Sequence, residues 1–242
     1  MRKLANLALG IAFLAAPSWA QTAEELVAKN LEAKGGLEKI KAIKTLKMQG
    51  RLQQGSFVIR MSVDTKPPNL IRQSITIQGM TQTQAFDGST GWQISPFQGR
   101  KDPEMLGEDD LRDLVDQSDF YGPLVDYKSK GNTVEFLGHE AVDGDDALRL
   151  KVTLKNGDIV NYYLDPDTFL EIRTELTEFI RGAVKESVTN LGSYKQVAGV
   201  FYPFSMEVGP KGSPQPGAKI NFDKIEANLA LDDSEFKMPA KP

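Results

Sequence analysis

The chain has 242 residues, of which 40% are hydrophobic and 26% are charged, and its formal net charge is −4. This composition is typical of a globular protein: it has too many apolar residues for a disordered chain and too few for a protein with several membrane spans. The sequence pI of about 5.2 argues against a dedicated nucleic-acid-binding protein, which needs a basic surface. The absence of cysteine excludes disulfides, thiolate nucleophiles and cysteine-ligated zinc.

Residues 1–20 have the pattern of a cleavable signal peptide. Two basic residues precede an apolar run over 4–16, and small residues at Ser18 and Ala20 fit a signal peptidase site. An uncleaved membrane anchor is the alternative, but the run is shorter than the roughly 20 apolar residues that a spanning helix needs. Because Gln21 rather than a cysteine follows the site, we predict an exported, soluble protein of the periplasm without a lipid anchor.

A helix is predicted at the start of the mature chain. Thr22 and Glu25 form a capping box, and apolar residues with helical spacing follow it. Gly35 and Gly36 are typical of a helix end, and a second short helical turn is expected over 37–42.

From residue 46 onward the apolar residues recur with a period of two, which predicts strands. Alternation is clear over 57–64, 71–78 and 148–154. Asp87-Gly88 and Asn156-Gly157 are turn signals that predict hairpins between the strands on either side of them.

A helix over 104–120 is predicted to interrupt the strands. Leu111, Leu114 and Val115 have helical spacing, and three acidic residues at 108–110 favour the helix N-terminus. A polar loop is expected over 209–217.

Together these elements predict a mainly β (α+β) protein with roughly ten or eleven strands and two main helices. The short connections favour antiparallel pairing, and a sheet of this size must curl or close. We therefore predict one domain over 21–242, with a strongly curved antiparallel sheet or incomplete β-barrel. The N-terminal helix and the mid-chain helix are expected to cover its concave face.

The motifs of common catalytic and metal sites do not occur in the sequence. His139 is the one histidine, and neither a phosphate-binding loop nor a serine-hydrolase elbow is present. We therefore predict a protein that is not an enzyme and that has no catalytic residues, no metal and no cofactor. A secreted hydrolase that uses a pair of carboxylates is a disfavoured alternative.

The apolar face of many strands can be interpreted in two ways. It is either an ordinary filled core or a concave cavity for a lipid, to which methionines adapt well. If it is a cavity, the candidate ligand-binding residues are Met48, Phe57, Ile59, Met61, Ile75, Ile77, Trp92, Leu111, Leu114, Leu150, Val152, Tyr162, Leu164, Ile172 and Met206.

Four segments, taken in order behind the leader, resemble one known family. They are AKGGLEKIKAI at 33–43, the hairpin FDGSTGW at 86–92, the strand–turn–strand segment 148–168, and a tail with Gly199-Val200, Pro203 and Phe236. On these segments the chain resembles exported proteins of the outer-membrane lipoprotein-sorting (LolA-like) superfamily, and the GG-containing segment indicates a divergent member.

The resemblance implies an incomplete β-barrel of about eleven antiparallel strands whose apolar interior receives acyl chains. It implies a soluble periplasmic carrier, without the lipidation cysteine of the anchored acceptor, that takes lipoprotein from an inner-membrane transporter to an outer-membrane acceptor. We therefore predict a monomeric carrier or chaperone for lipoprotein or other lipid, with 104–120 as a candidate lid. The alternative is an envelope sensor or assembly factor of the same fold that binds a protein partner without carrying lipid.

Overall fold

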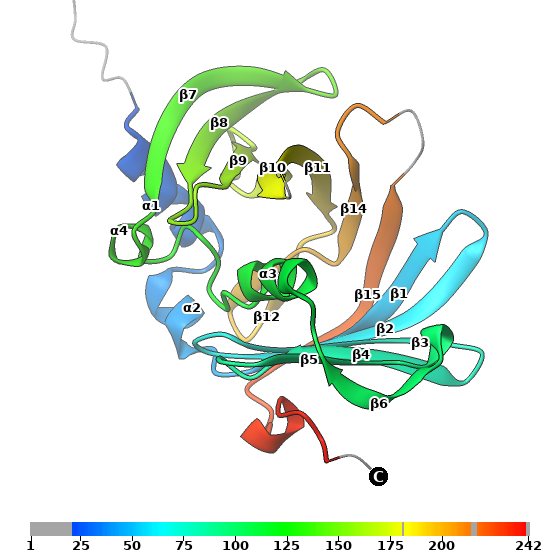
Figure 1. Ribbon diagram of the computed structural model, residues 1–242. Helices are drawn as coiled ribbons and strands as arrows, with labels where there is room; N and C mark the ends of the chain where they lie inside the picture. The colour runs from blue at the N-terminus through cyan, green and yellow to red at the C-terminus, as the bar shows by residue number, and fades with distance from the viewer. Residues whose placement is uncertain (1–20, 181, 214–216, 241–242) are drawn as a thin grey trace, which may run out of the picture.

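The computed structural model describes residues 21–180, 182–213 and 217–240, so the predicted signal peptide lies outside the described residues. Thirteen strands form one antiparallel sheet in the order β6-β5-β4-β3-β2-β1-β15-β14-β11-β10-β9-β8-β7. Figure 1 shows that this sheet curves strongly around the side on which helix α3 lies. The predicted curved, incomplete barrel is confirmed.

The strands follow from the alternation and the turns of the sequence. They are β1 (Leu46–Gln54), β2 (Phe57–Lys66), β3 (Leu70–Ile77), β4 (Met80–Phe86), β5 (Gly91–Ser95), β6 (Arg100–Met105), β7 (Thr133–Val142), β8 (Asp145–Thr153), β9 (Ile159–Leu164), β10 (Glu171–Ile180), β11 (Ala183–Gly192), β14 (Ser205–Pro210) and β15 (Ala218–Ala227). A separate two-stranded sheet pairs β12 (Lys195–Val197) with β13 (Val200–Tyr202).

Four α-helices lie among the described residues: α1 (Ala23–Ala33), α2 (Leu37–Ala42), α3 (Glu108–Gln117) and α4 (Tyr127–Lys130). The capping box is confirmed, because the backbone N–H of Glu25 donates to the Thr22 hydroxyl and the N–H of Thr22 donates to the Glu25 carboxylate. The chain leaves α1 through Gly35, which has a φ of +125°. A Cβ there would lie 2.2 Å from the carbonyl oxygen of Gly199, so this position needs glycine.

The strand count exceeds the expected ten or eleven. Strand β6 has a charged sequence that contains Pro103, so it shows no alternation, although it pairs with β5 at the edge of the sheet. The mid-chain helix is shorter than predicted and spans Glu108–Gln117, with a 3-10 turn, η1 (Pro96–Gln98), before β6.

The core lies on the concave side, where each helix covers a different part of the sheet. Leu26 and Val27 of α1 pack on the inner face of β8 and β9. Ile40 of α2 packs near β1 and β15, and Leu114 of α3 packs against β2, β3 and β4. The helices therefore leave the region between these contacts less covered.

The C-terminal segment packs on the outer face of the sheet. After β15 the chain passes below β4 and β5, on the side opposite α3, and forms the 3-10 turn η2 (Asp233–Glu235) (Figure 1). Phe236 is fully buried there, and the Trp92 indole N–H donates a 2.7 Å hydrogen bond to its carbonyl oxygen.

Candidate ligand-binding face

A continuous row of apolar side chains crosses the middle of the concave face. Directly opposed residues of antiparallel strands share a face. Leu52 of β1 lies opposite Ile59 of β2 and Ile220 of β15, Ile220 lies opposite Met206 of β14, and Met206 lies opposite Leu191 of β11. The row therefore spans five neighbouring strands without a charged side chain.

The row widens toward β3. Met61 lies opposite Ile75, and the period of two places Ile77 on the same face as Ile75 and Val208 on the same face as Met206. All of these side chains are partly exposed, unlike the fully buried residues beneath α1. We call this set the apolar band: Leu52, Ile59, Met61, Ile75, Ile77, Leu191, Met206, Val208 and Ile220.

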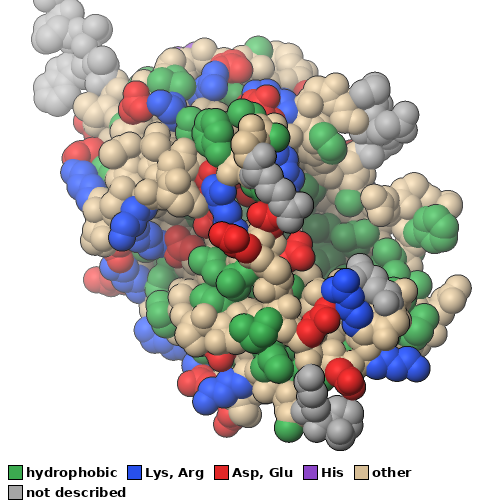
Figure 2. All heavy atoms as spheres, viewed as in Figure 1, with side chains coloured by type: hydrophobic (Ala, Val, Ile, Leu, Met, Phe, Trp, Pro, Cys, Tyr) green, Lys and Arg blue, Asp and Glu red, His purple; other side chains and the backbone are tan. Residues whose placement is uncertain are grey.

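The apolar band lies in a part of the concave face that the helices leave accessible. Figure 2 shows a hollow with hydrophobic side chains at its floor, to the right of centre, where Figure 1 places β14, β15 and β1. Met61, Met206 and Ile220 connect the band to the core, because they also pack against the cluster around Phe204 and Phe222.

Helix α3 crosses the concave side and bridges two distant parts of the sheet. One face of the helix is apolar: Leu111 and Leu114 pack with Phe86 at the end of β4. The other face is polar and is tied to the far strands. The Arg112 guanidinium donates to both carboxylate oxygens of Asp158, each at 2.6 Å, and to the carbonyl oxygen of Phe179 at 2.6 Å.

A cluster of charged groups lies where α3 meets β9 and β10. Carboxylate oxygens of Asp116, Asp158 and Glu178 lie within 4.8 Å of one another, which is a spacing that could hold a metal ion. Protein cations already engage two of the three carboxylates, because Arg112 donates to both oxygens of Asp158 and the Lys185 ammonium lies 3.5 Å from Glu178. We therefore interpret the cluster as the polar attachment of α3.

The pKa of Asp116 in this cluster is raised well above its ordinary value. Burial, followed by the nearby negative charge of Asp158, raises the pKa of Asp116 to about 6, while Arg112 lowers it in part. The attachment of α3 therefore contains a group that changes its charge near neutral pH.

Helix α1 is held by a second buried ion pair. Lys34, which follows α1, donates to Glu171 at 2.9 Å, and the Tyr194 hydroxyl donates to the same carboxylate at 3.1 Å. Burial on its own would raise the pKa of Glu171, but the Lys34 charge and these hydrogen bonds lower it overall. These contacts fix α1 over β8 and β9, whereas no helix covers the apolar band to the same extent.

The structure divides the predicted ligand-binding residues into groups. Five of them belong to the apolar band and Met48 adjoins it. Leu150, Val152, Tyr162 and Leu164 are buried in the core beneath α1, and Leu114 is buried beneath α3 with Leu111 at its edge. Phe57 lies at the tip of the β1–β2 hairpin, where 73% of its surface is exposed.

Two predicted residues lie on the opposite face of the sheet. Trp92 lies opposite Ala85, so it points away from the face that carries Phe86, and the C-terminal segment covers it. Ile172 packs with Tyr163 on the outer face, because a bulge between Glu171 and Arg173 shifts the alternation of β10. These two residues do not contribute to the concave face.

Leu52, Leu191, Val208 and Ile220 belong to the apolar band but are not among the sequence candidates. For Val208 and Ile220, the alternation of apolar residues is visible in the sequence. The sequence does not show that β1 pairs with β15 and that β11 pairs with β14. These pairings bring the four residues together.

His139 is exposed and its Nδ1 lies 2.7 Å from the carboxylate of Asp146, at the hairpin of β7 and β8. Among the described residues, no helix is long and apolar enough to cross a membrane.

An open, strongly curved antiparallel sheet with an apolar concave face and a helix across it defines an incomplete β-barrel. No protein-family profile matches the sequence, and no curated protein matches it by sequence. Comparison with solved structures, by contrast, finds this architecture over almost the whole length of several proteins.

A domain from Vibrio parahaemolyticus, described as an outer membrane lipoprotein-sorting protein, matches with a TM-score of 0.60 and 13% identity, over 88% of this chain and 97% of the other. A LolA superfamily protein from Nitrosomonas europaea matches with a TM-score of 0.57 and 15% identity, over 90% and 98%. A DUF1329 family protein from Desulfovibrio piger matches with a TM-score of 0.58 and 13% identity, over 89% and 97%. The chain has the LolA-like fold, and the resemblance stated from the sequence is confirmed at the level of the fold.

Proposed function

We propose that this protein is a periplasmic carrier that binds the acyl chains of a lipoprotein or another lipid on its concave face. The observation that carries this proposal is the apolar band, whose side chains stay partly exposed across six neighbouring strands. A folded protein gains stability by burying such a surface, so an apolar band that is left accessible indicates a ligand.

The driving force would be burial of the acyl chain. Each buried CH₂ group contributes about 0.8 kcal/mol, so a long chain supplies on the order of 10 kcal/mol before the cost of ordering it. Met61 and Met206 lie within the band, and their unbranched side chains can adapt to chains of different shape.

In this proposal α3 acts as the lid that was expected from the sequence. Its apolar face rests on the β4 side of the sheet, and its polar face is tied to β9 and β10 through Arg112 and Asp158. A lid that is attached to the far strands through side-chain contacts can release without unfolding the sheet, which would let a ligand enter or leave. An inner-membrane transporter and an outer-membrane acceptor are the proposed partners of a monomeric carrier.

The proposal is tested with two preparations. Mass spectrometry of lipid extracted from the protein expressed with residues 1–20 and isolated from its own periplasm should find bound lipid. A fluorescent fatty acid should bind to the purified protein expressed from residue 21 and be displaced by that lipid. Leu52→Asp places a charge in the middle of the band and should reduce binding at least tenfold, because burying a charge with acyl chain is costly.

Gln53→Asp is the matched control. Gln53 is the next residue of β1, is exposed, and points to the outer face. It should bind the fatty acid as the wild type does. Protein free of lipid in the periplasm, together with equal fatty-acid binding by both variants, would contradict the proposal. It would favour the alternative of an envelope protein that binds only a protein partner.

A further inference from the structure

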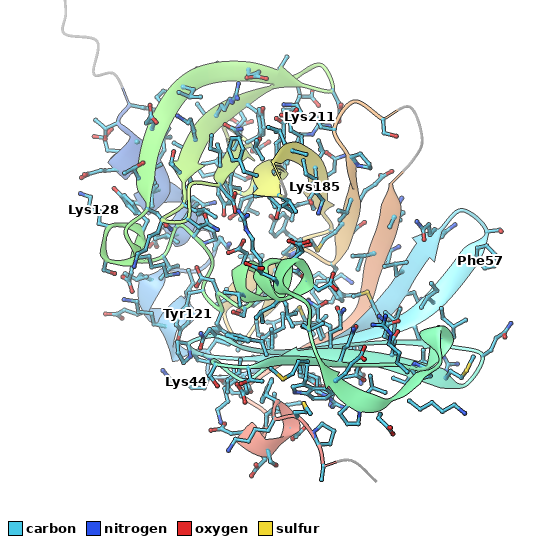
Figure 3. The ribbon with its side chains drawn as sticks, viewed as in Figure 1. Lys44, Phe57, Tyr121, Lys128, Lys185 and Lys211 are labelled. Atoms are coloured by element: carbon cyan, nitrogen blue, oxygen red, sulfur yellow. The ribbon has the colours of Figure 1, made fainter. Side chains whose placement is uncertain are left out.

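The tips of two adjacent hairpins, β1–β2 and β3–β4, carry large apolar side chains that nothing in the described structure covers. At these tips 73% of the surface of Phe57, 61% of Val58 and 44% of Met80 is exposed. Figure 3 labels Phe57 at the outer end of the β1–β2 hairpin, away from the body of the molecule. We call these three side chains the hairpin patch.

The sequence around the hairpin patch has no charge. Residues 52–59 and 73–86 contain no acidic or basic side chain, although 26% of the whole chain is charged. An uncharged tip with exposed apolar side chains can enter a low-dielectric environment at little desolvation cost. The patch is therefore suited to insertion into an apolar phase.

Behind the patch, on the outer face, β1, β2, β3 and β15 form a polar depression of about 590 Å³. Arg51 and Arg60 are directly opposed there. Hydroxyls of β2 and β3, and Asp223 and Lys224 of β15, also line it. Arg51 pairs with Asp223, whereas Arg60 is exposed and has no ion-pair partner among the residues the structure describes. The unpaired guanidinium lies three residues from Phe57, or about 10 Å along the strand.

This arrangement matches the two layers of a membrane surface. Apolar side chains at a tip can enter the boundary between headgroups and acyl chains, and an arginine one step back can contact a phosphate. Ile59 and Ile77 of the apolar band lie on the same two hairpins, so the band reaches the patch.

We propose that the β1–β2 and β3–β4 hairpin tips dock on a bilayer that contains anionic phospholipid, with the hairpin patch in the interface and Arg60 on a lipid phosphate. This inference rests on the proposed carrier function. Docking would place the end of the apolar band against the membrane from which the carrier takes a lipid.

The test is co-sedimentation of the protein, expressed from residue 21, with vesicles of phosphatidylethanolamine and phosphatidylglycerol. The wild type should bind, and the double variant Phe57→Ser/Val58→Ser should bind about tenfold or more weakly, because it loses two apolar side chains from the interface. Arg60→Gln should weaken binding about fivefold, and added salt or vesicles of phosphatidylcholine alone should have a similar effect.

The β10–β11 hairpin supplies a matched control. It exposes Phe179 and Val184, which are directly opposed and are 55% and 58% exposed. Phe179→Ser/Val184→Ser removes the same side chains from a different tip and should leave binding unchanged. Equal loss in both double variants, or no binding of the wild type to anionic vesicles, would overturn the proposed docking; in the second case a protein partner is the better occupant.

The Leu52→Asp variant separates this proposal from the carrier function. It should still dock on vesicles although it no longer binds fatty acid. If docking is lost in the hairpin variant while fatty-acid binding persists, the two functions are independent. If the wild type takes up fatty acid but does not sediment with vesicles, the docking proposal fails and the carrier function stands.

Discussion

The guanidinium of Arg112 donates from one nitrogen to both carboxylate oxygens of Asp158, and this contact joins α3 to the turn between β8 and β9. Asp158 is almost completely buried, and its carboxylate also accepts from the side chain of Asn156 and from the backbone N–H of Phe179. The pair is the principal polar link between the two parts of the sheet that α3 spans.

Replacement of Arg112 with glutamine should release α3. The buried carboxylate of Asp158 then lacks its cation, which is more costly than losing an exposed pair. We expect the melting temperature to fall by several degrees and limited proteolysis to cut faster within residues 106–119. Lys128→Gln removes a fully exposed pair with Glu24 and should change neither quantity. Unchanged proteolysis in R112Q would show that the apolar contacts of α3 hold it in place, and R112Q/D158N should recover part of the lost stability.

Stability should depend on pH through Asp116. Burial raises its pKa from the ordinary 3.8 of an aspartate to about 6 in the folded protein. The folded state therefore binds this proton more tightly, so the contribution to stability is present below about pH 4 and is lost as the pH rises through about 6. Asp116→Asn should be more stable than the wild type near pH 8, by roughly 1 kcal/mol after solvent screening, and equal to it near pH 4.

Chemical denaturation at several pH values measures this difference. Asp167→Asn, in the exposed turn after β9, serves as the control and should follow the wild-type curve. A constant offset between D116N and the wild type at every pH would show that Asp116 does not titrate in this range.

The contact between Trp92 and Phe236 provides a spectroscopic readout of the C-terminal segment. The chain has two tryptophans, and in protein expressed from residue 21 only Trp92 is present. Its indole is buried and donates to the carbonyl oxygen of Phe236, so the emission should be blue-shifted. Phe236→Ala removes a fully buried ring that anchors the C-terminal segment. It should lower the free energy of unfolding by about 3 kcal/mol and, by loosening that segment, shift the emission to the red. Met238→Ala, at an exposed position of the same segment, should do neither.

Gly35 should be among the positions least tolerant of substitution. Gly35→Ala introduces a side chain at a φ of +125° and a contact of 2.2 Å with the carbonyl oxygen of Gly199. We expect a loss of about 2 kcal/mol or more in urea unfolding. Gly192→Ala, where a Cβ meets nothing within 4 Å, should change stability by less than about 0.5 kcal/mol. Similar values for both variants would contradict the close approach at Gly35.

Sequence reasoning predicts the local elements well because their signals are local. The Asp87-Gly88 and Asn156-Gly157 turns lie between strands as expected, and the Thr22 capping box begins α1. Strand β6 escapes prediction because an edge strand needs neither alternation nor a continuous set of N–H donors, so its charges and Pro103 are tolerated.

The candidate site was predictable only in part, because membership of a face depends on long-range pairing. The alternation in a short strand does not show whether the face that carries Trp92 points to the concave side or to the outer side. Trp92 lies on the outer face and is buried there by a segment more than a hundred residues later in the sequence. A bulge in β10, which the sequence does not predict, places Ile172 on the outer face of the sheet. Leu52 and Ile220 become neighbours only when β1 pairs with β15.

The strand order also has a consequence for how the chain can be shortened. The first and last strands of the main sheet, β1 and β15, are neighbours at its centre, whereas the two outermost strands, β6 and β7, follow each other in the sequence and are joined through α3 and α4. Truncation that reaches β15, from residue 218 onward, therefore removes a central strand and divides the sheet into two halves instead of trimming an edge. Between β6 and β7 the chain then joins the two halves through the segment 106–132, which contains α3 and α4. During folding the thirteen-stranded sheet is therefore not continuous until the last strand, β15, has paired.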